Sequence, residues 1–451
     1  MALPCVWHCY ISSWGAAKVE VLIRGGRVVD PSQGLDRHLD IRIKDDKIAE
    51  LGTNLTLQQQ GDVNDEAISR VIDAHGCVVA PGLLDMHVHL REPGFEHKET
   101  IATGLAAAAV GGFTAVAAMA NTNPVHDTAA VTEFMLRRAA SVGGTRLYPI
   151  GAVSKGLEGQ ALAEIGGMQR AGIVGLSDDG MPVMNVRLMR RAMEYGCMLG
   201  LPVLSHCEDR GLSANGVMHE GVVSTALGLP GTPAAAENIM VYRDIQLAAL
   251  TGAHLHIQHV STAEAVELVR RAKAQGVAVS AEACPHHFTL TDEAVRGYDT
   301  NTKVNPPLRT ARDVEAVRRG LQDGTIEVIA SDHAPHHIME KECEYAEAPS
   351  GMVGLETSVG LAFRLYHDGL LSLSQMIAKF TVHPAHVLGL PHGALKVGGS
   401  ADITLLDPEH EMVVNADEFR SLGKNSPFIG WQLRGAAKLT MVDGRVIFER
   451  K

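Results

Sequence analysis

The sequence is poor in several kinds of residue, and each shortage excludes a class of protein. Seven cysteines among 451 residues are too few for a disulfide framework, which favours a reducing, cytoplasmic location. The 40 basic residues are outnumbered by 52 acidic ones, and the net charge of −12 argues against nucleic-acid binding. The sequence has no run of about 18 apolar residues, so a membrane-spanning helix is not expected.

The two ends of the chain differ from its middle. Residues 1–17 contain no lysine or arginine, so we interpret them as a disordered extension and not as a secretory signal. Short alternating apolar segments separated by turn signals follow in residues 18–77 and return in residues 391–451. Because neither end has enough strand to bury a face alone, we predict that both together build one small β-sandwich.

Residues 78–390 alternate short apolar runs with longer amphipathic stretches. This alternation predicts an α/β fold, a parallel (β/α)8 barrel of the TIM type. A doubly wound sheet is the alternative, but its usual phosphate loops, GxGxxG and GxxxxGK[ST], do not occur in the sequence. The eight strands are expected at residues 83–89, 114–119, 147–152, 173–177, 202–206, 254–259, 278–283 and 328–331.

Histidine is abundant, with 22 residues, and many of the histidines stand where a predicted strand ends. The carboxyl ends of barrel strands carry the chemistry of this fold. His87 and His89 close the first strand, and residues two apart on a strand point to the same side. Four further strands end in the pair Asp178–Asp179, in His206, in His259 and in Asp332.

Such a cluster of imidazoles and carboxylates is costly to bury unless a cation compensates it. Imidazole and carboxylate without thiolate suit zinc. Six protein ligands exceed the usual number around one zinc, so the sequence predicts a centre of two ions.

Several motifs resemble those of a known family: DMHVHLREPGFEHKET at 85–100, SDDG at 177–180, HCE at 206–208, HVST at 259–262, KVNPPLR at 303–309 and SDHAPH at 331–336. In this order they resemble the amidohydrolase superfamily and, within it, the bacterial class I dihydroorotases, from about residue 19 to the end. Other members of the superfamily use a carbamylated lysine where this sequence has an aspartate.

The resemblance implies a ligand set for two Zn²⁺ ions per subunit. His87, His89 and Asp332 would hold one ion, and His206 and His259 the other. Asp179 would bridge the two. The choice of Asp179 over Asp178 follows the family pattern, and the residues alone leave it open.

The resemblance further implies reversible cyclisation of N-carbamoyl-L-aspartate to L-dihydroorotate, a step of de novo pyrimidine (UMP) biosynthesis. Asp332 is then the catalytic residue, which takes a proton from the attacking water and delivers it to the ring nitrogen. Arg91 would pair with the substrate carboxylate. The other substrate contacts that the resemblance implies are His89, Asn121, Asn305, His336, Ser350 and Gly351.

Two other functions remain open. An allantoinase or hydantoinase also opens a cyclic amide, but it usually has the lysine bridge in place of Asp179. An inactive dihydroorotase-like scaffold for aspartate transcarbamoylase would lose metal ligands. The expected partners are the small-molecule substrate, further copies of the chain in a homo-oligomer and, as in some class I relatives, aspartate transcarbamoylase.

Overall fold

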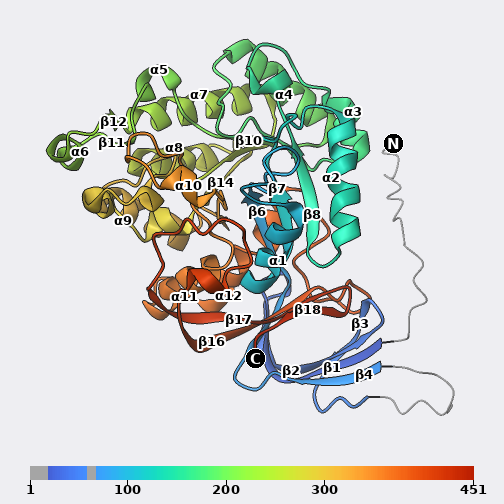
Figure 1. The fold of residues 1–451 in the computed structure, drawn as a ribbon. Helices are drawn as coiled ribbons and strands as arrows, with labels where there is room; N and C mark the ends of the chain where they lie inside the picture. The colour runs from blue at the N-terminus through green and yellow to red at the C-terminus, as the bar shows by residue number, and fades with distance from the viewer. Residues whose placement is uncertain (1–18, 58–67) are drawn as a thin grey trace.

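The computed structural model describes residues 19–57 and 68–451, and the predicted extension 1–17 lies outside these residues. The described part has two units (Figure 1): a barrel formed by the middle of the chain and a curved sheet formed by its two ends. None of the helices in the described ranges is long and apolar enough to cross a membrane.

The barrel strands pair in parallel and follow one another in sequence order. A parallel bridge between Val88 and His333 links the last strand region back to the first, so the barrel is nearly closed. The predicted parallel barrel is therefore confirmed. Its strands are β6 (Leu83–Val88), β7 (Phe113–Ala118), β8 (Arg146–Gly151), β9 (Gly175–Leu176), β10 (Val203–Ser205), β13 (Leu255–Ile257), β14 (Val279–Ala283) and β15 (Val328–Ile329).

Helices surround these strands (Figure 1). The first has clear local signals at both ends: Thr100 forms a capping box with Thr103, and Gly112, at φ 93°, ends the helix in the left-handed region. The longer helices are α1 (Ile101–Gly111), α2 (Ala129–Val142), α3 (Ile165–Ala171), α4 (Val186–Leu199), α7 (Ala235–Thr251), α8 (Ala263–Ala274), α9 (Ala311–Asp323) and α11 (Ser358–His367).

Shorter elements lie in the connections between barrel units. They are α5 (Arg210–Ser213), α6 (Val222–Leu227), α10 (Ile338–Lys341), α12 (Leu373–Ala378), α13 (Val382–Val387) and a small parallel pair, β11 (Met218–His219) with β12 (Gly231–Thr232).

Strands from both ends of the chain build the second unit, as predicted. They form one continuous curved sheet in the order β18-β17-β16-β5-β1-β2-β3, with β4 paired to β1. Buried side chains such as Ile23, Ile41, Ile403 and Leu439 form a common core between the two halves of this sheet. Its strands are β1 (Val19–Asp30), β2 (Leu35–Lys44), β3 (Lys47–Gly52), β4 (Ile68–Asp73), β5 (Val78–Pro81), β16 (Ile403–Val413), β17 (Gln432–Val442) and β18 (Arg445–Glu449).

The curved sheet is attached at the amino-terminal end of the barrel strands. Thr404 of β16 donates to the carbonyl of Gly112 at 2.7 Å and accepts from the amide of Leu83 at 3.3 Å. Arg146, at the start of β8, forms an ion pair with Asp402 at 3.0 Å. The carboxyl ends of the barrel strands are therefore on the side that the sheet leaves free.

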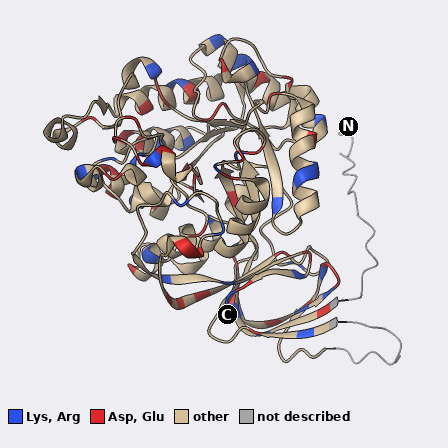
Figure 2. Ribbon diagram, viewed as in Figure 1, with Lys and Arg blue, Asp and Glu red and all other residues tan. Residues whose placement is uncertain are grey.

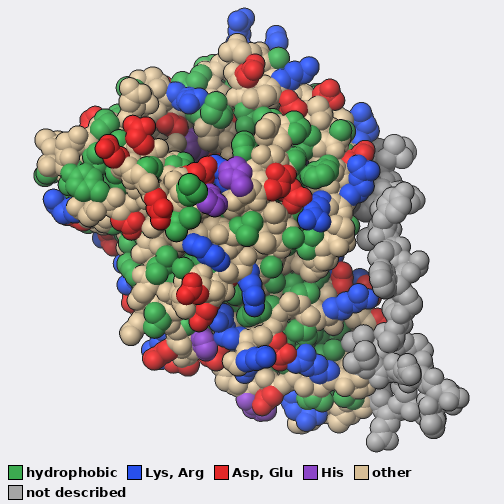
Figure 3. Space-filling view, in the orientation of Figure 1, with side chains coloured by type: hydrophobic (Ala, Val, Ile, Leu, Met, Phe, Trp, Pro, Cys, Tyr) green, Lys and Arg blue, Asp and Glu red, His purple; other side chains and the backbone are tan. Residues whose placement is uncertain are grey.

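Charged side chains of both signs are interspersed over the two units (Figures 2 and 3). The face shown has no continuous stripe of lysine and arginine. On this face, positive charge at a binding site would therefore come from individual residues and not from a basic patch.

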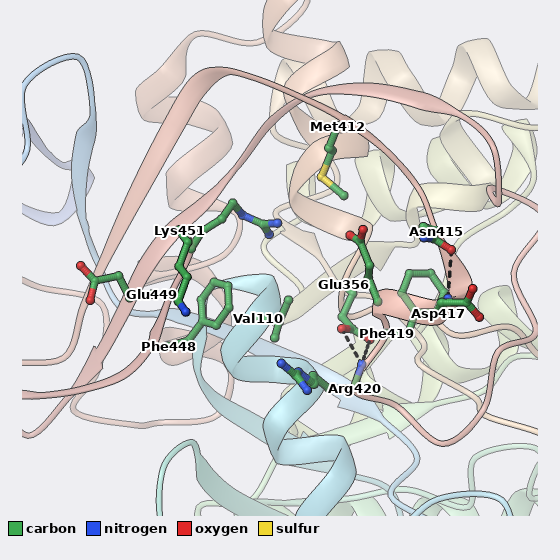
Figure 4. A pocket seen from close by; sticks show the side chains of 12 residues that line it. Val110, Glu356, Met412, Asn415, Asp417, Phe419, Arg420, Phe448, Glu449 and Lys451 are labelled. Atoms are coloured by element: carbon green, nitrogen blue, oxygen red, sulfur yellow. Dashed lines mark hydrogen bonds between the residues drawn. The ribbon is translucent and has the colours of Figure 1, made fainter.

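A cavity of about 480 Å³ lies where the end of α1 meets the carboxyl-terminal strands (Figure 4). Val110, Phe419 and Phe448 contribute apolar surface to its wall. Glu356 also lines the cavity and accepts hydrogen bonds from the backbone amides of Arg420 at 2.9 Å and Ser421 at 3.4 Å. Burial raises the pKa of Glu356 to about 7, so this carboxyl takes up a proton more readily in the fold than in the unfolded chain.

We predict that Glu356→Gln stabilises the protein at alkaline pH. A carboxyl whose pKa is raised by folding from 4.5 to about 7 favours the fold below pH 4.5, and this contribution is lost as the pH rises through 7. The glutamine stays neutral, so the variant should exceed the native protein by about 1–2 kcal/mol at pH 8 and match it near pH 4.5.

Thermal unfolding at both pH values measures this difference. Glu449→Gln is the matched control, because Glu449 lines the same cavity with a side chain that is 45% exposed. A stability gain of Glu356→Gln that is the same at both pH values, or that Glu449→Gln shares, would contradict the explanation.

Candidate metal centre

The carboxyl ends of five barrel strands bring the six predicted ligands to one place. None of the six residues is more than 8% exposed. Figure 3 shows histidine side chains near a hollow on the face of the barrel. The residues that meet there are His87 and His89 at β6, Asp179 after β9, His206 after β10, His259 after β13 and Asp332 after β15.

Asp179 lies in the middle of this cluster. Its Oδ1 atom is 3.5 Å from His87 Nε2, 3.4 Å from His206 Nδ1 and 3.5 Å from His259 Nε2. Its Oδ2 atom is 3.3 Å from His89 Nε2. Asp179 therefore faces both predicted pairs of histidines, as a bridging carboxylate must.

Asp332 faces only the first pair. Its Oδ1 atom is 3.1 Å from His89 Nε2 and 3.5 Å from His87 Nε2. The backbone of Asp332 has φ 49° and that of His259 has φ 33°, a region that non-glycine residues rarely adopt. Two residues of the cluster are thus held in strained conformations, a feature that is frequent at functional sites.

Several atoms of the cluster lack the partners that buried polar atoms normally have. Within the described residues, His87 Nε2 and Asp179 Oδ1 have no hydrogen bond. His206 Nδ1 and His259 Nε2 face each other at 2.8 Å. A cation bound between such buried acceptor atoms would supply the partner that they lack. The cluster therefore fits a binuclear metal site.

Two of the histidines, His87 and His206, have raised pKa values and hold protons strongly. Burial alone would lower the pKa of His206, but hydrogen bonds and charge from Asp179 and Glu208 outweigh it and raise the pKa to about 10. Charges of Glu282, Asp332 and Asp179 likewise overcome burial and raise the pKa of His87. A metal ion must displace these protons, so metal binding should release protons to solvent.

Two glutamates that the sequence reasoning missed set the orientation of the ligands. Glu282 Oε1 lies 2.5 Å from His87 Nδ1, and Glu208 Oε2 lies 3.0 Å from His206 Nε2. Each carboxylate accepts a proton from one ring nitrogen and leaves the other nitrogen facing Asp179. The spacing of His206 and Glu208 in HCE could have indicated the second glutamate, because residues two apart share a side.

Asp178 points away from the cluster. Its carboxylate accepts hydrogen bonds from the backbone amides of Val153 at 2.7 Å and Ser154 at 3.0 Å and from the Ser154 hydroxyl. These bonds hold the loop after β8. Of the two adjacent aspartates, Asp179 alone lies among the histidines.

Two of the predicted substrate contacts touch residues of the metal cluster. Asn121 Oδ1 lies 2.8 Å from His89 Nδ1. Asn305 Nδ2 donates to Glu208 Oε2 at 2.9 Å, and Glu208 in turn contacts His206. Both amides are therefore next to the cluster, although in this structure they orient metal-facing side chains.

The remaining predicted contacts lie on the loops that follow β6 and β15. Arg91 donates from Nε to the carbonyl of Pro335 at 3.2 Å. His336 Nε2 is 2.9 Å from the carbonyl of Ser350. Gly351 has φ 132°, and a β-carbon there would lie 3.1 Å from His336 Nε2. The close approach of these loops requires glycine at position 351.

Comparisons with known proteins agree with this geometry. Residues 76–265 match the Dihydro-orotase-like family, and residues 233–448 match the Amidohydrolase family. A dihydroorotase from Pelotomaculum thermopropionicum is 56% identical over 432 residues, which are 96% of this chain and 99% of the relative. A dihydroorotase from Syntrophus aciditrophicus is 50% identical over 431 residues, 96% of this chain and all (100%) of the relative.

Solved structures share the fold. The L-hydantoinase of Arthrobacter aurescens has a TM-score of 0.83 at 29% identity, covering 95% of this chain and 96% of that one. The dihydropyrimidinase of Brevibacillus agri has a TM-score of 0.81 at 24% identity, covering 95% of each chain, and supports the fold alone. Together with the full-length relatives, these findings establish that the chain belongs to the dihydroorotase family of metal-dependent amidohydrolases.

Proposed function

We propose that the chain is a zinc-dependent dihydroorotase that interconverts N-carbamoyl-L-aspartate and L-dihydroorotate in pyrimidine (UMP) biosynthesis. The observation that carries the proposal is the buried cluster around Asp179, found in a chain that is 56% identical to a dihydroorotase over 96% of its length. The proposed location of the enzyme and its small-molecule substrate is the cytoplasm.

Two Zn²⁺ ions would be held by the six clustered side chains. His87, His89 and Asp332 would hold one, His206 and His259 the other, with Asp179 between them. Bound zinc lowers the pKa of water to about 7 and polarises a carbonyl oxygen. The support for this ligand set is that Asp179 has an oxygen within 3.5 Å of all four histidines.

Asp332 would move the proton. In the hydrolytic direction, its carboxylate accepts a proton from the attacking water and passes it to the ring nitrogen as the amide bond breaks. In cyclisation the same group takes the proton from that nitrogen and returns it to the departing water. Asp332 is the most exposed of the six, at 8%, and is therefore the one that a substrate can reach most easily.

Arg91 would bind the substrate carboxylate. The Arg91 side chain is half-buried near Asp332 and Asp179, and its Nε atom donates a hydrogen bond to the carbonyl of Pro335. Within the described residues, no hydrogen bond or ion pair engages its two terminal nitrogens. A fixed guanidinium with free terminal nitrogens suits bidentate binding of a carboxylate. The further substrate contacts proposed are His89, Asn121, Asn305, His336, Ser350 and Gly351.

A hydantoinase is the second candidate, because a protein of that name shares the fold with a TM-score of 0.83. A comparison of turnover on dihydroorotate, hydantoin and allantoin separates the candidates. We expect turnover of dihydroorotate alone, and turnover of hydantoin without dihydroorotate would reject the proposal. An inactive scaffold is disfavoured because all six ligands are present.

The assembly of the protein is a separate proposal. We propose a homo-oligomer, with aspartate transcarbamoylase as a candidate partner because some class I relatives assemble with it. Light scattering of the purified chain, alone and mixed with that enzyme, measures both.

We predict that His206→Ala loses metal and activity together. Removing this imidazole takes a ligand from the second ion, and the loss of several kcal/mol of transition-state stabilisation lowers kcat/KM by about 10³-fold. Elemental analysis should show fewer zinc ions per chain. His254→Gln is the matched control, since His254 precedes β13, the strand that pairs with β10, at the opposite end of the barrel from His206, and bonds Ser280 at 3.0 Å. Full zinc content in His206→Ala would contradict the ligand set.

We predict that Arg91→Met keeps its zinc but uses the substrate poorly. Loss of a bidentate carboxylate contact should raise KM and lower kcat/KM by about 10²-fold. Arg138→Met is the control, because the Arg138 side chain is 41% exposed on α2 and pairs only with Glu92 among the described residues. An unchanged KM in Arg91→Met would remove Arg91 from the substrate site.

A further inference from the structure

A second group of side chains of the kinds that bind metals lies next to the centre described above and shares no residue with it. Cys284, His286 and His287 follow β14 in the sequence CPHH. One nitrogen or sulfur atom from each lies within 4.8 Å of the other two, as close as the corresponding atoms of His87, His89 and Asp179.

The local sequence explains why these side chains converge. Cys284 is extended, with φ −91° and ψ 149°, and ends the strand. Pro285 then begins a 3-10 turn over Pro285–Phe288, which the His287 amide closes by donating to the Cys284 carbonyl at 2.9 Å. The turn folds the two imidazoles back beside the thiol, with ring centroids 4.3 Å apart.

All three side chains are removed from solvent, at 0% exposure for Cys284, 2% for His286 and 3% for His287. His287 Nε2 lies 2.9 Å from the carbonyl of Pro306 and must donate its proton there, which leaves Nδ1 with a free lone pair. That Nδ1 atom and His286 Nε2 are without a hydrogen bond in the described part of the chain.

Unpaired polar atoms are rarely left in a protein interior, and here they gather around one thiol. The mechanism proposed above uses none of the three residues, so catalysis does not account for them. Thiolate and imidazole nitrogen together form the ligand set of zinc and other borderline-soft cations.

We propose that Cys284, His286 and His287 form a third metal site, which binds one Zn²⁺ ion separately from the binuclear centre. Around a tetrahedral zinc the ligand atoms would lie about 3.5 Å apart, so small side-chain rotations complete the site. Three protein ligands leave a fourth position for water. The site goes beyond the proposed dihydroorotase activity, which needs only the two ions held around Asp179.

An ion at this site would tie together two segments that frame the metal centre. His287 is already bonded to Pro306, and the preceding residue, Asn305, contacts Glu208 beside His206. The third ion is therefore expected to stabilise the fold around the binuclear centre without entering the reaction.

Cobalt substitution of the full chain tests the site by a signal that the binuclear centre does not give. Thiolate bound to Co²⁺ produces a charge-transfer absorption in the near ultraviolet, and the centre around Asp179 contains no thiolate. The native protein, stripped of metal and reloaded with Co²⁺, should show this absorption and three ions per chain. Cys284→Ser should lose the absorption and one ion, and keep more than half of the dihydroorotase activity.

Cys207→Ser is the matched control, because Cys207 is 3% exposed, stands next to His206 and should not affect the absorption. His287→Gln gives a second test if Cys284→Ser does not fold, as judged by circular dichroism, and should also lose one ion. Two ions and no thiolate absorption in the native protein, or absorption that persists in Cys284→Ser, would overturn the proposal. Three ions without turnover of dihydroorotate would instead reject the proposed function and leave the third site standing.

Discussion

One buried carboxylate facing four imidazole rings is the constraint on which the rest of the site depends. Asp179 is 5% exposed, and an oxygen of its side chain lies within 3.5 Å of His87, His89, His206 and His259. So many acceptors could not share one dry space without a compensating positive charge. Protons on His87 and His206 can supply that charge, and the cluster also fits metal ions, on which the family of this chain depends.

The surroundings of the cluster set the orientation of its side chains. Glu282 and Glu208 each engage the outer nitrogen of a histidine, so the inner nitrogen is presented to the centre. The carboxylate of Asp178 accepts hydrogen bonds from the loop after β8, so its neighbour Asp179 is the aspartate that lies among the histidines. The orientation of the histidine rings is thus set by Glu282 and Glu208, which are not among the six predicted metal ligands.

The curved sheet and the loops of the candidate site lie at opposite ends of the barrel. The curved sheet from both chain ends joins the amino-terminal end of the barrel through Thr404 and Asp402. β5 (Val78–Pro81) pairs with β1 on one side and β16 on the other, so it unites segments more than 300 residues apart just before the first barrel strand begins. The opposite end of the barrel is left open for the loops that carry Arg91, Asn305 and His336.

The sequence by itself determined the barrel, since each strand has its own apolar run, and it determined that strands from the two ends build one unit, which was predicted as a small sandwich and is one continuous sheet. It also determined that His87 and His89 face one way, because residues two apart on a strand share a side. The roles of Glu282 and Glu208, and the choice between Asp178 and Asp179, were decided only by the tertiary structure. Glu282 is 195 residues from His87 along the chain, and no local pattern can pair residues that meet only when the barrel closes.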